Sequence, residues 1–345
     1  MSGVSGLNIR AREGDFVETL EGLIFDVKGL LHPQGRVIAY LRYVPDGRGV
    51  RQKNGIKYRK VYDLTARWEL IRARWPAYLY RDTVLNREVQ AIPAAKLKQH
   101  YQPSERLWAL KHTSELDRLE RAAVEMAEIL VKKSGVSPSK IGVSGSILVG
   151  LQTTGSDIDL ILYGSDTARR CYSELLALCK TSQEGFSSYG RRELHKLYVQ
   201  RGASKSTPFE TFVKHESPKV LQGKFKGTDY FVRCVKDWDE LHEAYGDCKY
   251  YTAGRATVHA RIGSDLDAIF TPNTYELEAA KVSRKFLPLT QVVSFRGRFC
   301  EQVHKGEDVI AKGKLEKVVH GHDEAYRLVV GEDPRDYLLA VERRG

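Results

Sequence analysis

Residues 156–162 read SDIDLIL, two aspartates separated by one apolar residue at the start of an apolar run. In a strand, alternation places Asp157 and Asp159 on one face, with Ile158 and Leu160 on the other. Two carboxylates this close repel each other, and a cation between them relieves that cost. The stretch therefore predicts a strand that begins at a cation site; the alternative is an edge strand whose two aspartates are simply solvated.

A turn of small residues precedes this strand. Residues 141–146 read IGVSGS, which predicts a short strand that ends at Gly145 and Ser146. Such a turn lets backbone N–H groups approach a phosphate closely. A phosphate cradle beside paired carboxylates is suited to phosphoryl or nucleotidyl transfer with Mg²⁺. We expect Gly145, Ser146 and Ser156 to bind the nucleotide.

Together, the turn, the gap of ten residues (147–156) and the acidic pair resemble the signature of the DNA polymerase β-like nucleotidyltransferase superfamily. Ser144 departs from that signature, because the superfamily usually has an apolar residue there. The resemblance implies an enzyme that uses Mg²⁺ (or Mn²⁺) to transfer a nucleotide from an NTP to an acceptor, with release of pyrophosphate. It also implies that Asp157 and Asp159 are catalytic metal ligands.

The same resemblance implies a third catalytic carboxylate on a later strand. Asp229 is the expected residue, because it precedes the apolar stretch 230–232 on the strand that should return beside the acidic pair. A rival is GSDLD at 263–267, which echoes GSDID at 155–159. The third metal ligand is therefore predicted at Asp229, while Asp265, Asp267 and the absence of such a residue stay open.

The length of 345 residues exceeds what one hydrophobic core usually holds. We predict an α+β protein with a central polymerase β-like palm, a mixed sheet with helices, flanked by β-rich domains. The expected division is a basic β-rich domain at 1–103, the nucleotidyltransferase domain at 104–245 and a barrel-like or sandwich-like domain at 246–345. Within the central domain, apolar spacing predicts helices over 104–133, 165–180, 191–201 and 208–221.

Positive charge is concentrated near the N-terminus. The net charge is +11, and residues 1–103 hold 18 Lys and Arg against 10 Asp and Glu. Asn54-Gly55 predicts a tight hairpin turn between strands at 50–53 and 56–62. This hairpin is expected to contact nucleic acid, RNA or tRNA, through basic and aromatic residues, the alternative being an ordinary solvated hairpin. The residues expected to bind are Arg51, Lys53, Lys57, Tyr58, Arg59 and Lys60.

The C-terminal third contains a second basic and aromatic stretch. Residues 295–299 read FRGRF, a candidate RNA contact, although a core strand with exposed arginines is the favoured interpretation. Residues 22–29, 268–272 and 294–299 also resemble an uncharacterised archaeal group of predicted nucleotidyltransferases. An alternative function is a catalytically inactive nucleic-acid-binding protein that kept the fold.

Other features concern the location of the protein. No apolar run approaches the roughly 20 residues of a membrane span. The N-terminus has no charged segment followed by an apolar one, so no secretory signal is expected. The five cysteines lack zinc-ligand or CxxC spacing, so we expect mostly buried, reduced thiols. A cytoplasmic protein with no membrane partner is predicted; the sequence does not indicate its oligomeric state.

Overall fold

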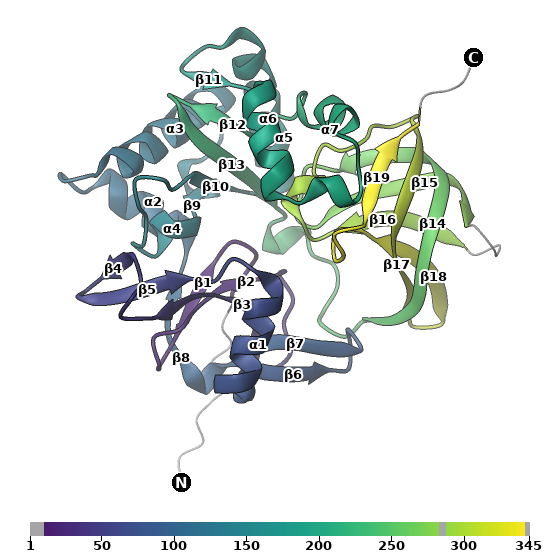
Figure 1. The fold of residues 1–345 in the computed structure, drawn as a ribbon, viewed down its shortest axis with the longest axis horizontal. Coiled ribbons are helices and arrows are strands. Elements are labelled where there is room, and N and C mark those ends of the chain that lie inside the picture. Colours follow the sequence, from purple (N-terminus) through teal and green to yellow (C-terminus); the bar gives the residue numbers. More distant parts are fainter. Residues whose placement is uncertain (1–9, 283–287, 342–345) are drawn as a thin grey trace. The chain divides into compact units, whose positions relative to one another are not determined.

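The computed structural model describes residues 10–282 and 288–341 (Figure 1). The chain forms two compact units. The first contains the residues up to 167 together with 237–246, and the second contains 168–236 and the residues from 247 onward. Both units combine helices with sheets, which confirms the α+β class. The division into three domains at 103/104 and 245/246 stays a prediction.

An antiparallel sheet makes up most of the first unit. Its order is β4-β5-β3-β2-β1-β8, with β7 paired to β3 and β6 to β7. Asn54 and Gly55 have φ values of 48° and 78°, as the predicted tight hairpin requires. The strands are β1 (Phe16–Thr19), β2 (Ile24–Val27), β3 (Arg36–Pro45), β4 (Arg51–Lys53), β5 (Ile56–Lys60), β6 (Leu79–Asp82), β7 (Arg87–Pro93) and β8 (Leu97–Tyr101), and helix α1 spans Leu64–Arg74.

Two helices follow the sheet where one was predicted. Helix α2 (Pro103–Lys111) ends before α3 (Arg118–Ser134) begins, so the continuous helix over 104–133 was wrong. A capping box starts α3: Asp117 accepts the Glu120 backbone N–H at 2.8 Å, and the Glu120 side chain accepts that of Asp117. The capping box therefore starts a new helix at Arg118 instead of continuing α2.

The predicted motif region forms a compact strand, turn and strand. Strand β9 (Ile141–Val143) pairs antiparallel with β10 (Ile158–Tyr163), with Val143 opposite Leu160. The single helical turn α4 (Gly145–Leu148) lies between them in the chain. Both strands are almost wholly buried, so their apolar side chains fix the register that aligns the turn with the acidic pair.

Helices and a hairpin form the first part of the second unit. The elements are α5 (Ser165–Thr181, which begins in the first unit), β11 (Phe186–Ser187), α6 (Arg191–Gln200), α7 (Phe209–Glu216), β12 (Gln222–Phe225) and β13 (Thr228–Val235). Strands β11, β12 and β13 pair antiparallel in that order. Helix α7 was predicted to reach 221 but ends at Glu216, because Pro218 disfavours helical backbone at the residue before it.

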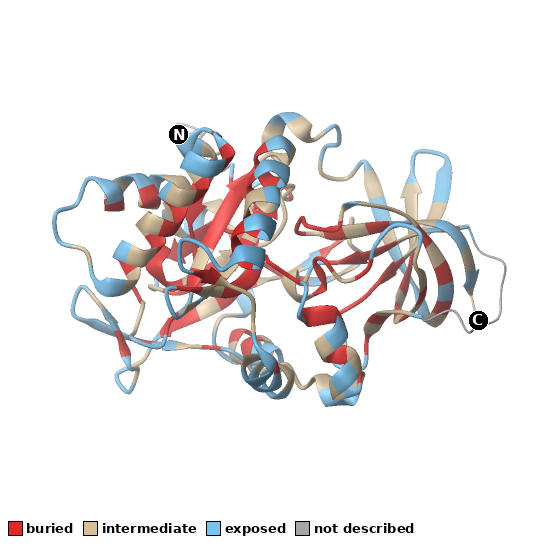
Figure 2. Ribbon diagram, turned by 90° about the horizontal axis from the view of Figure 1, so that it is seen from above, coloured by how far each residue is buried: buried red, intermediate tan, exposed pale blue. Residues whose placement is uncertain are grey.

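A closed barrel completes the second unit. Its ring is β14-β15-β16-β18-β17, and pairing of β17 with β14 closes it, while β19 adds to β17. Figure 2 shows buried residues along these strands, and their apolar side chains form one core cluster. The strands are β14 (Cys248–Asp267), β15 (Asn273–Val282), β16 (Leu289–Ser294), β17 (Asp308–His320), β18 (Asp323–Val329) and β19 (Tyr337–Ala340).

One predicted strand of this barrel is shorter than expected. Strand β16 stops at Ser294, and Gly297–Phe299 form a 3₁₀ turn. The interpretation of 296–298 as core strand with exposed arginines was therefore wrong. A Cβ on Gly297 would lie 2.3 Å from the Phe231 ring, so close packing of the turn on β13 sets the chain's course here.

The burial of the cysteines matches the sequence-based expectation. Four of the five cysteines are buried and Cys248 is partly buried, as predicted. Among the described helices, none combines the length and the apolar character that crossing a membrane demands.

Candidate active site

The small-residue turn and the acidic pair are in direct contact. The Ser144 backbone N–H donates to the Asp159 carbonyl at 2.8 Å. Gly145 has φ +62°, and a Cβ at this position would lie 1.9 Å from Asp159 Oδ2. Only glycine meets both conditions, because other residues are strained at this φ and would collide with the carboxylate. The structure therefore joins the two halves of the motif through Gly145.

The two serines of the turn have different environments. Ser144 Oγ donates to the Gly14 carbonyl at 2.6 Å, which satisfies a hydroxyl at the position where the signature has an apolar residue. Ser146 Oγ is buried and has no hydrogen-bond partner among the described residues. Such a group costs free energy unless a ligand or water satisfies it. Ser146 is thus the member of the turn with unused hydrogen-bonding capacity.

Side chains from β3 and β5 lie within electrostatic reach of the acidic pair. Burial raises the pKa of Tyr43, and the negative charges of Asp159 and Asp157 raise it further, against opposing arginines. Burial lowers the pKa of Lys60 most, and the positive charge of the nearby Arg42 lowers it further. The negative charge of Asp157 partly opposes both effects. Tyr43 and Lys60 therefore add a protonated phenol and a cation to the site, and Arg42 lies near both of these residues. The sequence motif alone did not indicate Arg42 or Tyr43.

Arg51 connects the hairpin to the loop before the acidic pair. Its side chain is buried and donates to the Leu151 carbonyl, and Nη1 lies 3.4 Å from Ser156 Oγ. Ser156 Oγ also accepts the Thr153 backbone N–H at 2.9 Å. Both residues, predicted to bind ligands, thus have internal contacts that hold the loop preceding Asp157.

The other predicted nucleic-acid contacts are divided between the interior and the surface. Tyr58 is buried in a cluster with Tyr43 and Leu148. Lys53 donates to the Tyr101 hydroxyl at 2.7 Å. Arg59 pairs with Asp46 at 3.0 Å, and Lys57 is exposed. Lys57 and Arg59 are the predicted residues that face solvent most freely, and their contact with nucleic acid stays a prediction.

The proposed third carboxylate lies on the β12–β13 hairpin. Asp229 is directly opposite Lys224, whose Nζ lies 3.0 Å from its Oδ1, and its side chain is 55% exposed. Over residues 10–282 and 288–341, no three His, Cys, Asp or Glu side chains gather as a metal-binding cluster. The assignment of Asp229 as a third metal ligand stays a prediction.

The rival acidic pair at the end of β14, Asp265 and Asp267, lies against basic side chains. Asp265 lies 3.3 Å from His304 Nδ1. Asp267 lies 2.6 Å from Lys236 and 3.7 Å from Arg169. These contacts connect the end of β14 to neighbouring parts of the second unit, and the alternative that Asp265 or Asp267 is the third metal ligand stays a prediction.

The fold and the motif place the chain among α+β proteins in which a glycine turn is set against an acidic strand. No family model and no solved structure matches the chain. The chain is 32% identical to "Uncharacterized protein MJ1086" of Methanocaldococcus jannaschii over 333 residues, which cover 94% of this chain and 96% of that protein. It belongs to the archaeal family that includes this relative.

Proposed function

We propose that the protein is a nucleotidyltransferase that transfers a nucleotide from an NTP to an RNA acceptor and releases pyrophosphate. The observation that carries this proposal is the contact between Gly145 and the Asp159 carboxylate. It places a turn able to approach phosphates beside a carboxylate pair able to hold a divalent cation. The resemblance to the polymerase β-like superfamily rests on these same residues.

The residues present fit Mg²⁺ or Mn²⁺. Asp157 is exposed and Asp159 is half-buried, and carboxylates are the hard oxygen ligands that Mg²⁺ takes together with substrate phosphates. Asp157 and Asp159 would hold the ion, with Asp229 proposed as a further ligand. When bound, the ion supplies positive charge that stabilises the reacting phosphates.

The remaining residues would orient the triphosphate. Gly145 and Ser146 would offer backbone N–H groups and an unsatisfied hydroxyl to phosphate oxygens. Lys60 and Arg42 would balance the charge of the triphosphate. In the reaction, the acceptor hydroxyl oxygen forms a bond to the α-phosphorus and loses its proton to water. The bond from the α-phosphorus to the bridging oxygen breaks, and pyrophosphate leaves with that electron pair.

Charge and architecture support RNA as the acceptor. The excess of Lys and Arg in residues 1–103 attracts a polyanion. Lys57 and Arg59 present part of this charge on the solvent side of the hairpin. The closed ring β14-β15-β16-β18-β17 is a five-stranded barrel, the form in which OB-folds bind oligonucleotides. This last support is an analogy of architecture alone.

A second candidate function is a nucleic-acid-binding protein that has lost turnover. The specific observation in its favour is the ion pair between Asp229 and Lys224, which engages the proposed third carboxylate. Such a protein would bind RNA tightly without Mg²⁺, and binding would survive Asp157→Ala.

Incorporation of label distinguishes the two functions. Each of the four labelled NTPs is incubated with total RNA, the protein and Mg²⁺ or Mn²⁺, and the RNA is resolved on a gel. The proposed enzyme labels a defined RNA band, and Asp157→Ala abolishes the label while RNA affinity is retained. RNA binding without label transfer by the wild type would instead support the non-catalytic protein.

A further inference from the structure

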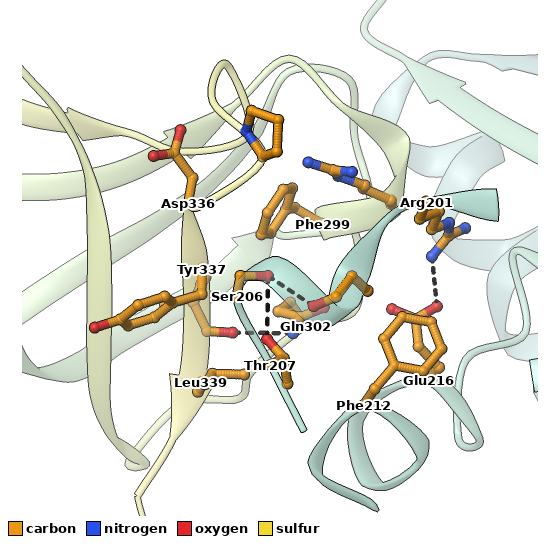
Figure 3. A pocket seen from close by; sticks show the side chains of 14 residues that line it. Arg201, Ser206, Thr207, Phe212, Glu216, Phe299, Gln302, Asp336, Tyr337 and Leu339 are labelled. Carbon is orange, nitrogen blue, oxygen red and sulfur yellow. Dashed lines mark hydrogen bonds and ion pairs between the residues drawn. The ribbon is translucent and has the colours of Figure 1, made fainter. Parts of the chain in front are cut away.

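A pocket in the second unit combines buried positive charge with an apolar lining (Figure 3). It lies between the segment from α6 to α7 and the barrel side formed by the 3₁₀ turn and β19. Figure 3 shows Phe212 and Phe299 among the lining side chains, together with Ser206 and Thr207. The acidic pair and the glycine turn belong to the other unit, so this pocket is a separate site.

Arg298 is the unusual residue of the pocket. Its Nε is buried and has no hydrogen-bond partner among the described residues. Its backbone carbonyl accepts a hydrogen bond from Lys219 Nζ at 2.7 Å, which connects the 3₁₀ turn to the segment that follows α7. Burial, and then the repulsion of Arg296 and Arg201, lowers the pKa of Arg298 to about 10. The guanidinium therefore remains charged at neutral pH, and Glu216 and Asp336 only partly offset the effects of burial and of the neighbouring arginines.

The carboxylates near Arg298 are already engaged. Glu216 accepts Arg201 at 2.8 Å and Lys219 at 2.7 Å. Burial raises the pKa of Glu216, but Lys219 and Arg201 outweigh this and lower it to about 2. Asp336 accepts the backbone N–H groups of Gly331 and Asp333, each at 3.0 Å, and pairs with Arg255.

This arrangement leaves an excess of positive charge beside the pocket. The three carboxylates Glu216, Asp336 and Glu301 face five cations, an excess of two positive charges; the cations are Arg201, Lys219, Arg255, Arg296 and Arg298. An unpaired buried charge is costly, and a ligand anion relieves that cost. A dianion matches the excess of two charges better than a monocarboxylate does.

We propose that this pocket binds the phosphate group of a small phosphate monoester. The phosphate would accept from Arg298 and from the hydroxyl of Ser206 or Thr207, which would turn from their present acceptors, the Ala203 carbonyl and Ser206 Oγ. The organic part of the ligand would contact Phe212 and Phe299. A phosphate monoester carries nearly two negative charges at neutral pH, which is the charge the pocket lacks.

Isothermal titration of the full chain tests this site. The probes are phenyl phosphate, benzoate as the monoanion of similar shape, and inorganic phosphate. Phenyl phosphate should bind saturably, and more tightly than benzoate. Arg298→Ala should weaken phenyl phosphate binding by about tenfold or more, since a charge-assisted hydrogen bond is lost, and Arg298→Lys should lose less.

Three controls make the result specific. Arg192→Ala removes an exposed cation of α6 that does not line the pocket, and it should leave binding unchanged. Asp157→Asn/Asp159→Asn should also leave it unchanged, which separates this proposal from the proposed catalytic function. Thermal unfolding should show that Arg298→Ala remains folded, and Thr207→Val provides a milder second variant that should also weaken binding.

Several outcomes would overturn the proposal. They are the absence of saturable phenyl phosphate binding to folded wild type, equal losses in Arg298→Ala and Arg192→Ala, and benzoate binding as tightly as phenyl phosphate. A 5′-phosphorylated trinucleotide that binds more tightly than phenyl phosphate, and equally dependent on Arg298, would overturn the small-molecule assignment in favour of an RNA end.

Discussion

The chain contains the same five-residue pattern twice, and the two copies have different surroundings. GSDID at 155–159 leads into a buried strand beside a glycine turn, whereas GSDLD at 263–267 ends the long strand β14. In the first copy the Asp159 carboxylate lies against the backbone of Gly145. In the second, Asp265 pairs with His304 and Asp267 with Lys236.

The difference shows that an acidic pair acquires its role from what the fold places opposite it. A cross-strand register sets Gly145 against Asp159, and Lys60 of β5 lies near enough to interact with Asp157. No such turn precedes the second pair, whose carboxylates lie against His304 and Lys236 of the same unit. The first copy is therefore the candidate for chemistry, and the second is a structural connection.

The largest predicted effect separates the two acidic pairs. Asp157→Asn/Asp159→Asn should reduce nucleotide incorporation by at least about 10³-fold, because the metal-binding carboxylates would be lost. Asp265→Asn/Asp267→Asn should retain activity within about twofold, since ion pairs of this kind act mainly on stability. Initial rates with one NTP and one RNA measure both. Comparable losses in the two double variants would contradict the comparison.

Gly145 provides a test of the contact that distinguishes the first copy. Gly145→Ala should lower activity by about tenfold or more, and the free energy of unfolding by about 1–2 kcal/mol, because it combines left-handed strain with a clash. Gly150→Ala is the matched control, since Gly150 has φ +68° and a Cβ added there would meet nothing within 4 Å. It carries the backbone strain without the clash, so it should lose less stability than Gly145→Ala and keep its activity. Equal activity in both variants would show that contact with Asp159 is unimportant.

Lys60 tests the cations near the first copy. Lys60→Ala should raise the KM for NTP by about tenfold, because a charge-assisted contact to phosphate would be lost. Lys57→Ala, on the exposed part of the same strand, should leave KM unchanged. An unchanged KM in Lys60→Ala would remove this residue from the site.

The pH dependence of KM gives an independent test of Lys60. Its pKa is lowered by burial and by Arg42, so its charge should disappear on raising the pH before that of an ordinary lysine, near about 10.4. The KM of the wild type should therefore rise as the pH is raised, at a pH below that at which an ordinary lysine titrates, and this rise should be absent from Lys60→Ala. Parallel pH profiles for the two proteins would contradict the assignment.

The smallest effect concerns the second copy alone. Asp267→Asn should lower the free energy of unfolding by about 0.5–1 kcal/mol, because its ion pairs are partly exposed and so contribute little. Urea denaturation followed by circular dichroism measures this change. High salt should reduce the difference from wild type. A large loss of activity without loss of stability would give Asp267 a catalytic role.

Turn residues and apolar alternation predicted the elements whose structure depends on neighbouring residues in the chain. The Asn54-Gly55 hairpin and the strands around the motif were found because turn residues and alternation are read within a few positions. The break between α2 and α3 was missed although Asp117 and Glu120 form a readable capping box. Strand β14 was not predicted either, although the apolar alternation of Val258, Ala260 and Ile262 is a readable signal within it.

The sequence could not predict contacts that depend on pairing between distant strands. Tyr43 reaches the acidic pair from β3, and only the register of the first sheet sets it opposite Lys60 of β5. Arg51 was expected to face nucleic acid, but it is buried against the loop at Leu151. Arg298 lies beside a pocket because packing of Gly297 on Phe231 sets the course of its turn.

Binding of a nucleotide at the acidic pair is the most direct test of the proposed site. A non-hydrolysable NTP analogue is titrated calorimetrically into wild type and into Asp157→Asn/Asp159→Asn, with Mg²⁺ and with EDTA. We predict saturable binding to the wild type that requires Mg²⁺ and is lost in the double variant. Binding of equal affinity in both proteins, or none to a folded wild type with Mg²⁺, would contradict a nucleotide site at this acidic pair.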